Sequence, residues 1–147
     1  VVIEGIKNAL KPYVSRISSS KEPQINHQKY VQHLYTPIRA KLKCSFSTAE
    51  LDKIFEALHP TPAVCGYPKE EALRQIQRIE EFDRGWYAGA VGWIDSKSVE
   101  FSVAIRSTLK INNDSWFWAG AGLIESSNSL DEWNEIQAKS IQFRGIS

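Results

Sequence analysis

The fold of this chain is decided by the stretch Ala57-Leu58-His59-Pro60-Thr61-Pro62-Ala63-Val64-Cys65-Gly66. Proline cannot continue a helix and restricts the residue before it. Pro60 and Pro62 therefore end a preceding helix and leave His59 to Gly66 as an extended turn. The preceding helix begins with a capping-box pattern, Ser47-Thr48-Ala49-Glu50, in which hydroxyl and carboxylate can satisfy each other's backbone N–H groups. The turn thus lies at a fixed point between two helices.

On the N-terminal side of this stretch, apolar residues at helical spacing predict an amphipathic helix over residues 1–14. This helix lacks an N-cap, so we expect it to continue a segment upstream of Val1. Residues 18–26 are polar and predict a loop, and residues 30–42 predict an edge strand or two short strands around Pro37. On the C-terminal side, Pro68 at a first helical turn predicts a second helix.

The last third of the chain predicts antiparallel strands. A second motif, Phe82-Asp83-Arg84-Gly85-Trp86-Tyr87-Ala88-Gly89, leads into them. Three strand-like segments separated by turn residues predict a meander, with strands over 85–94, 99–111 and 116–124. Ser129-Leu130-Asp131-Glu132 is a second capping-box pattern that predicts a last helix to about Gln142. The order of elements is α+β, with antiparallel strands and flanking helices.

Composition excludes several classes of function. The 147 residues include 18 Lys and Arg against 17 Asp and Glu, so no basic field gathers nucleic acid. The apolar runs are far shorter than the roughly 20 residues that cross a bilayer, and two cysteines are too few to staple a fold. We expect one soluble globular unit in a reducing compartment. No histidine and cysteine share a zinc-ligand spacing.

The predicted last helix carries Glu132, Glu135 and Lys139 on one face, within an arc of roughly 60° at about 100° per residue. Two carboxylates so placed are hard oxygen ligands suited to Mg²⁺, and the lysine can meet an anionic substrate. The alternative is a solvated face with a helix ion pair.

Two further positions could bind an anion. Arg106 ends Phe101-Ser102-Val103-Ala104-Ile105-Arg106, where strand alternation places it among small side chains and a guanidinium could grip a carboxylate; the alternative is a surface arginine. Gly120, in Ala119-Gly120-Ala121-Gly122, weakens a strand unless something approaches the backbone, and tight sheet packing is the alternative. Gly122 is better explained by packing.

Taken together, these motifs resemble the C-terminal part of the chorismate-utilising enzymes, most closely isochorismate synthase. The turn Pro60-Thr61-Pro62-Ala63-Val64 is similar to the isochorismate synthase form, whereas anthranilate and aminodeoxychorismate synthases typically carry Pro-Ala-Gly-Thr-x-Ser-Gly there. The resemblance implies part of an anthranilate synthase-like α/β sandwich and conversion of chorismate to isochorismate with Mg²⁺.

The resemblance also implies roles for individual residues. Tyr87 and Arg106 would bind the enolpyruvyl carboxylate, and the backbone N–H of Gly120 and the ammonium of Lys139 would bind substrate carboxylate. Glu135 would bind magnesium, with Glu132 as an outer partner. The remaining two implied residues line the substrate: they are Ala63 and His33. A histidine such as His33 is otherwise a satisfied core residue.

The general base, the general acid, a Gly-Thr motif and a further magnesium glutamate of the family lie upstream of the matched region. The resemblance therefore implies that residues 1–147 are the C-terminal portion of a chorismate-binding domain whose N-terminal half is absent. Two hypotheses follow. The chain is a part or subunit of an isochorismate synthase, inactive until completed, or it is a non-catalytic descendant that serves as a binding or structural subunit.

The expected partners are chorismate and the missing half or a partner subunit, with no nucleic acid and no membrane-spanning segment. The resemblance implies the cytoplasm or plastid stroma, and leaves the pathway open between menaquinone or phylloquinone and salicylate or siderophore biosynthesis. Because half of the layers are absent, we expect an exposed apolar flank around four tryptophans: Trp86, Trp93, Trp116 and Trp118.

Overall fold

The computed structural model describes residues 2–27, 32–43 and 47–143. These residues divide into two compact units, the first extending to Glu81 and the second beginning at Phe82. Length and composition had predicted a single unit, because they do not show where contacts between distant parts of the chain become sparse.

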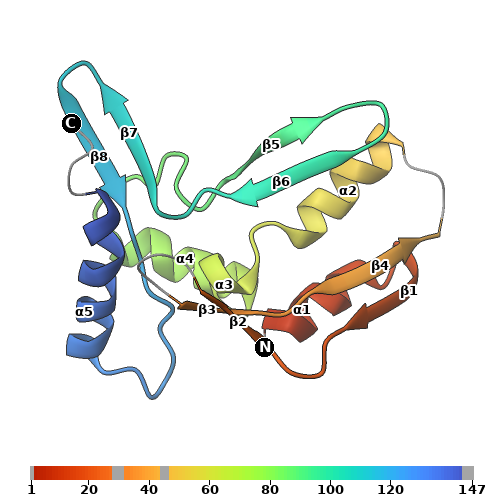
Figure 1. Ribbon diagram of the computed structural model, residues 1–147, viewed down its shortest axis with the longest axis horizontal. Coiled ribbons are helices and arrows are strands. Elements are labelled where there is room, and N and C mark those ends of the chain that lie inside the picture. The colour runs from red at the N-terminus through yellow and green to blue at the C-terminus, as the bar shows by residue number, and fades with distance from the viewer. Residues whose placement is uncertain (1, 28–31, 44–46, 144–147) are drawn as a thin grey trace. The chain divides into compact units, whose positions relative to one another are not determined.

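The first unit combines helices with two antiparallel strand pairs (Figure 1). Its elements are α1 (Val2–Leu10), β1 (Val14–Ser19), β2 (Gln24–His27), β3 (Gln32–Tyr35), β4 (Ile38–Leu42), α2 (Thr48–Leu58), α3 (Pro62–Cys65) and α4 (Lys69–Ile79). β1 pairs with β4, and β2 pairs with β3. The predicted loop over 18–26 is confirmed only for residues 20–23, because residues 18–19 belong to β1 and residues 24–26 belong to β2. The two short strands around Pro37 are confirmed.

The helices of the first unit follow the sequence more closely. At the start of α2, the Glu50 N–H donates to Ser47 Oγ at 3.3 Å, which confirms the predicted cap. The Glu50 carboxylate accepts from the Ser47 hydroxyl at 3.0 Å rather than from its N–H. The first helix ends at Leu10 rather than residue 14, because Val14 enters β1. Pro68 is the N-cap of α4.

The His59–Gly66 turn is more helical than predicted, since Pro62 to Cys65 form the single turn α3. Thr61 is its N-cap, and the Gly66 N–H closes it on the Pro62 carbonyl at 2.9 Å. A Cβ added to Gly5 of α1 would lie 3.1 Å from Pro62 Cγ, so the glycine lets α3 pack closely against α1. The peptide bonds before Pro60 and Pro68 are cis.

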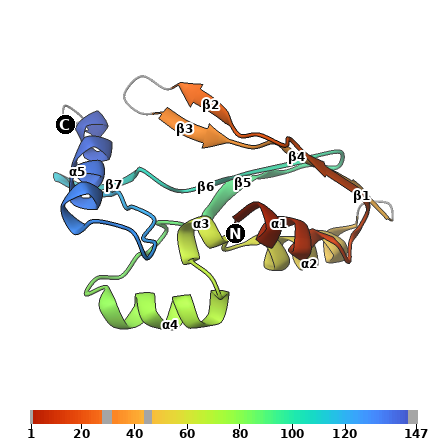
Figure 2. The same cartoon turned by 90° about the horizontal axis from the view of Figure 1, so that it is seen from below.

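The second unit contains two β-hairpins and a terminal helix (Figures 1 and 2). Its elements are β5 (Ala90–Ile94), β6 (Val99–Val103), β7 (Ser107–Ile111), β8 (Asp114–Trp118), α5 (Ser129–Ser140) and the 3₁₀ turn η1 (Ile141–Phe143). β5 pairs with β6, and β7 pairs with β8, in separate two-stranded sheets. The predicted three-stranded meander is wrong, because the segment 99–111 is broken after Val103.

The two turns of these hairpins form where the sequence predicted them. Asp95 Oδ1 accepts from the N–H groups of Lys97 and Ser98 at 2.6 and 2.8 Å, and these bonds lower the pKa of its carboxyl group. Asn112 has a φ of 54° in the β7–β8 turn, a left-handed conformation that asparagine tolerates. After α5, the Phe143 ring stacks on Phe117 of β8, with centroids 5.4 Å apart.

Little of the described chain is buried. The buried apolar residues are Val14, Leu51 and Cys65 in the first unit and Ala88 and Phe143 in the second. Trp86 is 82% exposed, and Trp93 and Trp116 are about half exposed, whereas Trp118 is partly buried. The expected exposure of apolar side chains is confirmed for three of the four tryptophans. None of the described helices is long and apolar enough to cross a membrane.

Candidate functional site

Tyr87 lies in a turn rather than at the start of a strand. Asp83 Oδ1 accepts from the Gly85 N–H at 2.8 Å, and the Tyr87 N–H donates to the Arg84 carbonyl at 2.8 Å. Gly85 and Ala88 have φ values of 53° and 64°, which no extended strand adopts. The predicted strand from Gly85 therefore begins only at Ala90.

Arg106 also lies in a turn, between β6 and β7. The Ile105 N–H donates to the Val103 carbonyl at 2.8 Å, which ends β6, and Arg106 has a φ of 51°. The strand alternation predicted through Arg106 is therefore wrong, and the turn sets the direction of its side chain. A left-handed conformation at a non-glycine residue is uncommon and costs free energy, so it is often found at functional positions.

Two backbone hydrogen bonds join these two turns. The Ala88 N–H donates to the Ala104 carbonyl at 2.9 Å, and the Ala104 N–H donates to the Gly89 carbonyl at 2.8 Å. Tyr87 and Arg106 each lie within two residues of this pair. The backbone thus brings together the two residues that were predicted to bind one carboxylate.

Gly120 lies so close to the Tyr87 hydroxyl that any larger residue would have to displace the tyrosine side chain. A Cβ built on Gly120 would lie 2.5 Å from Tyr87 Oη. At Gly122, an added Cβ would meet nothing within 4 Å, so the described residues give no packing reason for that glycine. The close approach predicted for the Ala119–Gly122 stretch is therefore specific to Gly120.

Lys139 connects Gly120 with the last helix. Its Nζ donates to the Gly120 carbonyl at 2.9 Å and forms an ion pair with Glu135 one turn earlier on α5. The Lys139 side chain is 16% exposed, whereas that of Glu135 is 54% exposed. Tyr87, Gly120, Lys139 and Glu135 are therefore linked by successive contacts, although the sequence separates them by up to 52 positions.

Glu132 lies one turn before Glu135 on α5 and has a partner of its own. The Ser127 hydroxyl donates to Glu132 Oε1 at 2.5 Å. The N-cap of α5 is Asn128, whose side chain accepts from the N–H groups of Leu130 and Asp131, so the predicted cap at Ser129 is one residue late. Asparagine and serine are both good N-caps, and residues 126–129 are all of these two types, so the sequence alone does not show which of them caps α5.

A magnesium ion could find a partial set of ligands here. Within the described ranges, no group of three or more His, Cys, Asp or Glu residues could hold a metal ion. Mg²⁺ is often held by one or two carboxylates together with substrate oxygens and water. The half-exposed carboxylate of Glu135, with Glu132 one turn away, fits that incomplete donor set.

Arg84 is a further candidate that was not predicted from the sequence. Its guanidinium carbon lies 5.7 Å from the centroid of the Tyr87 ring, within the range of a cation–π contact. Its position three residues before Tyr87, in a glycine-containing turn, was the available signal. With Lys139 and Arg106, it adds positive charge near Tyr87.

The remaining two predicted residues belong to the first unit. Ala63 lies on α3 with its side chain exposed, while its neighbour Cys65 is buried. His33 pairs with Asn26 in the β2–β3 register, but its side chain lies outside the described part of the structure. The roles of all the predicted site residues stay predictions.

Comparison with known proteins gives the family. The model of the family described as chorismate binding enzyme matches residues 1–144. The chain belongs to this family. Isochorismate synthase MenF of Bacillus subtilis is 42% identical over 140 residues, and isochorismate synthase 2, chloroplastic, of Arabidopsis thaliana is 42% identical over 146 residues. The salicylate biosynthesis isochorismate synthase of Pseudomonas aeruginosa is 40% identical over 140 residues.

These matches cover most of this chain and a smaller part of each relative. They span 95%, 97% and 95% of the chain but only 29%, 25% and 29% of the three relatives, in the same order. A crystal structure of DhbC of Bacillus anthracis, assigned as a 2,3-dihydroxybenzoate-specific isochorismate synthase, matches with a TM-score of 0.90 at 36% identity. That match covers 99% of this chain and 39% of the solved one. This family member therefore corresponds to a part of the enzymes it resembles.

Proposed function

We propose that this chain is the C-terminal part or subunit of a magnesium-dependent isochorismate synthase, which converts chorismate to isochorismate once the rest of the fold is supplied. The observation that carries the proposal is the linked set Tyr87, Gly120, Lys139 and Glu135. This set consists of a tyrosine, a mostly buried lysine and a half-exposed carboxylate, which are linked through the backbone of a glycine that lies against the tyrosine hydroxyl. Lys139 is paired with Glu135, so the mostly buried cation is held in place for a substrate carboxylate and the half-exposed carboxylate for a metal ion.

In this reaction, water adds to C2 of chorismate while the C4 hydroxyl leaves. Lys139 and Arg106 hold the substrate carboxylates by charge-assisted hydrogen bonds, and Tyr87 orients one of them. Lys139 donates to the Gly120 carbonyl and leaves the Gly120 N–H for the substrate carboxylate, to which that N–H is assigned. Bound Mg²⁺, held on the protein side by Glu135 and supported by Glu132, would neutralise carboxylate charge.

The base that activates water and the acid that protonates the leaving hydroxyl come from the remainder of the enzyme. The exposed apolar surface supports this division. The β7–β8 hairpin, with Phe82, borders a shallow groove of about 740 Å³ that is lined by Leu109, Trp116 and Phe117. Surface of this kind is typical of a face that another layer covers. The completed fold would be an anthranilate synthase-like α/β sandwich.

The compartment belongs to the same proposal. The relatives include bacterial and chloroplastic enzymes, so the chain would act in the cytoplasm or the plastid stroma. The product would feed menaquinone or phylloquinone synthesis, or salicylate or siderophore synthesis.

The alternative function is a non-catalytic subunit that keeps the fold for binding or assembly. The matches, which span only 25% to 29% of three relatives, are equally consistent with it.

A complementation assay tests the proposal. The purified chain is incubated with chorismate and Mg²⁺, with and without the N-terminal portion of the enzyme, and isochorismate is followed by chromatography. We expect no turnover by the chain alone, because each lost acid or base group costs about 10²–10⁴-fold. Turnover on complementation would establish the function. Turnover by the chain alone would contradict the division of labour, and a folded but silent complex would favour the non-catalytic subunit.

A further inference from the structure

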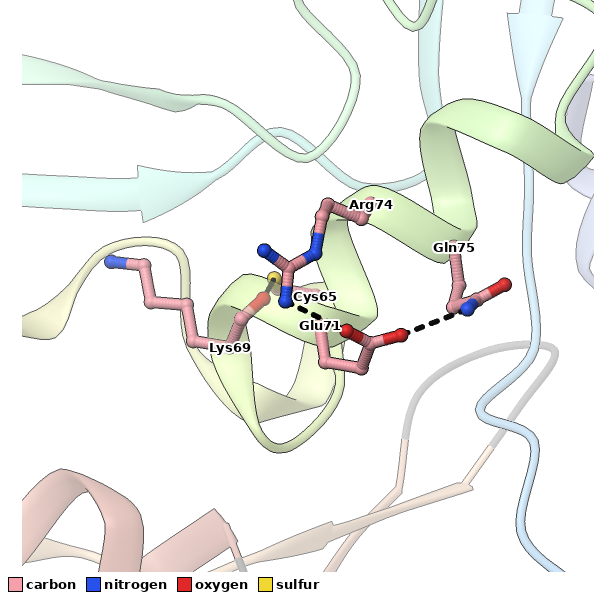
Figure 3. Close-up of polar contacts among 5 residues, drawn as sticks. All are labelled: Cys65, Lys69, Glu71, Arg74 and Gln75. Carbon is pink, nitrogen blue, oxygen red and sulfur yellow. Dashed lines mark hydrogen bonds and ion pairs between the residues drawn. The ribbon is translucent and has the colours of Figure 1, made fainter.

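Lys69 is the first residue of α4, where a positive charge faces the positive end of its own helix dipole. The carboxylate of Glu71, two residues later, does not pair with the Lys69 ammonium group. Glu71 instead accepts from Gln75 and Arg74 on the same helix, at 2.9 and 2.7 Å, and these contacts lower the pKa of Glu71 (Figure 3). The Lys69 ammonium group therefore finds its partners elsewhere.

Those partners are at the C-terminal end of α2. Lys69 Nζ donates to the His59 carbonyl at 2.8 Å and to the Glu56 carbonyl at 3.4 Å. The last carbonyls of a helix lack partners within the helix and carry its negative end. Lys69 satisfies this end from outside, because its side chain reaches back across the turn. The pKa of His59 is lowered, first because the imidazole is partly buried and second because the positive charge of Lys69 is nearby.

The backbone of Lys69 contacts the opposite end of the same turn. Its carbonyl lies 3.6 Å from Cys65 Sγ, which is the weak thiol donor. Figure 3 shows this contact on one side of Lys69 and its side chain extending to the other. Cys65 is 2% exposed and is the most deeply buried residue among those that the structure describes in the first unit. One residue therefore holds both His59 and Cys65.

The segment between these two points is α3 with its caps. Gly66 ends it with a φ of 90°, and an added Cβ there would lie 2.9 Å from Ala72 Cβ of α4, so the segment fits tightly against α4. Ala63 lies between the two held points, and its side chain is exposed while Cys65 is buried. Holding both ends thus fixes the direction in which Ala63 faces.

We propose that Lys69 is a positioning residue for the His59–Gly66 turn and that, through this turn, it sets where Ala63 meets the substrate. The first part stands on the contacts of Lys69 itself. The second part rests on the proposed function, because it is the resemblance to isochorismate synthase that assigns Ala63 to the substrate. Lys69 itself need not touch the substrate.

The first test measures how often the turn opens. In the full-length native protein, the alkylation rate of Cys65 is followed by mass spectrometry of its peptide, for wild type, Lys69→Met and Lys69→Arg. Lys53→Met is the matched control, since it removes the charge of an exposed lysine on α2. We expect Lys69→Met to label about two- to tenfold faster for each lost hydrogen bond. Lys69→Arg, which keeps a donor, should stay near wild type.

Equal labelling of Lys69→Met and Lys53→Met would overturn the proposal. If Lys69→Met does not fold, Lys69→Gln takes its place, because glutamine keeps part of the side-chain packing and loses the charge. Retention of wild-type labelling in a folded Lys69→Gln variant would also overturn it.

The second test asks whether the turn acts on the substrate. In the active enzyme, Lys69→Met should raise KM for chorismate about two- to tenfold with a smaller change in kcat, and Lys69→Arg should restore it. In a double-mutant cycle with Ala63→Val, the two effects should be less than additive, because both displace the same contact. Additive effects would overturn the substrate part of the proposal. If the wild-type protein does not convert chorismate, the proposed function fails, while the labelling rates still decide whether Lys69 holds the turn.

Discussion

Lys139 donates a hydrogen bond of 2.9 Å from Nζ to the main-chain carbonyl of Gly120, and the same ammonium group pairs with Glu135. The Lys139 side chain is only 16% exposed, and it binds the backbone of the glycine that lies against the Tyr87 hydroxyl. The helix α5 and the segment after β8 are joined at this point. Four predictions follow from this cluster and from the His59 turn.

Replacing Lys139 with methionine should weaken chorismate binding. The substitution keeps the length of the side chain and removes the charge, so the substrate loses one charge-assisted hydrogen bond. We expect KM to rise roughly 10- to 100-fold in the completed enzyme. Steady-state kinetics measures this effect. Lys110→Met, an exposed lysine of β7, is the charge-matched control and should leave KM near wild type. Equal effects of both variants would contradict the role of Lys139.

Gly120→Ala should displace Tyr87, whereas Gly122→Ala should not. The new methyl group at position 120 would lie 2.5 Å from Tyr87 Oη, and at position 122 it would meet nothing within 4 Å. Forced close contacts of this kind typically cost about 1–3 kcal/mol. Urea unfolding should therefore show a lower free energy of unfolding for Gly120→Ala only. Equal stability of the two variants would show that Tyr87 moves away without cost.

The stability of the chain should depend on pH through His59. Burial, and then the positive charge of Lys69, lowers the pKa of His59 from its ordinary value of 6.5. The unfolded state therefore binds a proton first as the pH falls, and stability decreases from pH 6.5 downwards until the folded pKa is passed. Urea unfolding at several pH values measures this loss.

His59→Gln is the control for that experiment, because it removes the titrating group and should flatten the pH dependence over this interval. Lys69→Met should raise the pKa of His59 towards 6.5 without reaching it, since burial remains the larger cause. Nuclear magnetic resonance titration of the imidazole follows this change. An unchanged pKa in Lys69→Met would place the ammonium group away from His59.

Glu135→Gln should weaken magnesium-dependent binding of chorismate more than Glu132→Gln. Glu135 is half exposed and can turn from Lys139 towards a metal ion, whereas Glu132 is engaged by the Ser127 hydroxyl. Isothermal titration of the completed enzyme with chorismate, at several Mg²⁺ concentrations, measures the difference. A larger loss for Glu132→Gln would exchange the two assignments.

The parts of the fold that were predicted from sequence are those set by neighbours in the chain. The Ser47 cap, the turn at Asp95 and the helical face of α5 arise from contacts over three or four residues, which a local pattern records. The family was recognised in the same way, from two short motifs. The strand predicted from 99 to 111 failed because both of its halves favour β structure, and only the tight turn at Val103–Ile105 separates them.

By itself, the sequence determined the family, the α+β class and which residues could bind an anion. Only the tertiary structure decided that Lys139 reaches Gly120, that Tyr87 needs a glycine beneath its hydroxyl and that Lys69 spans the His59–Gly66 turn. The physical reason is the same in each case. These contacts join atoms that lie far apart along the chain or on opposite sides of a turn, and their geometry depends on how whole helices and strands pack rather than on any local preference.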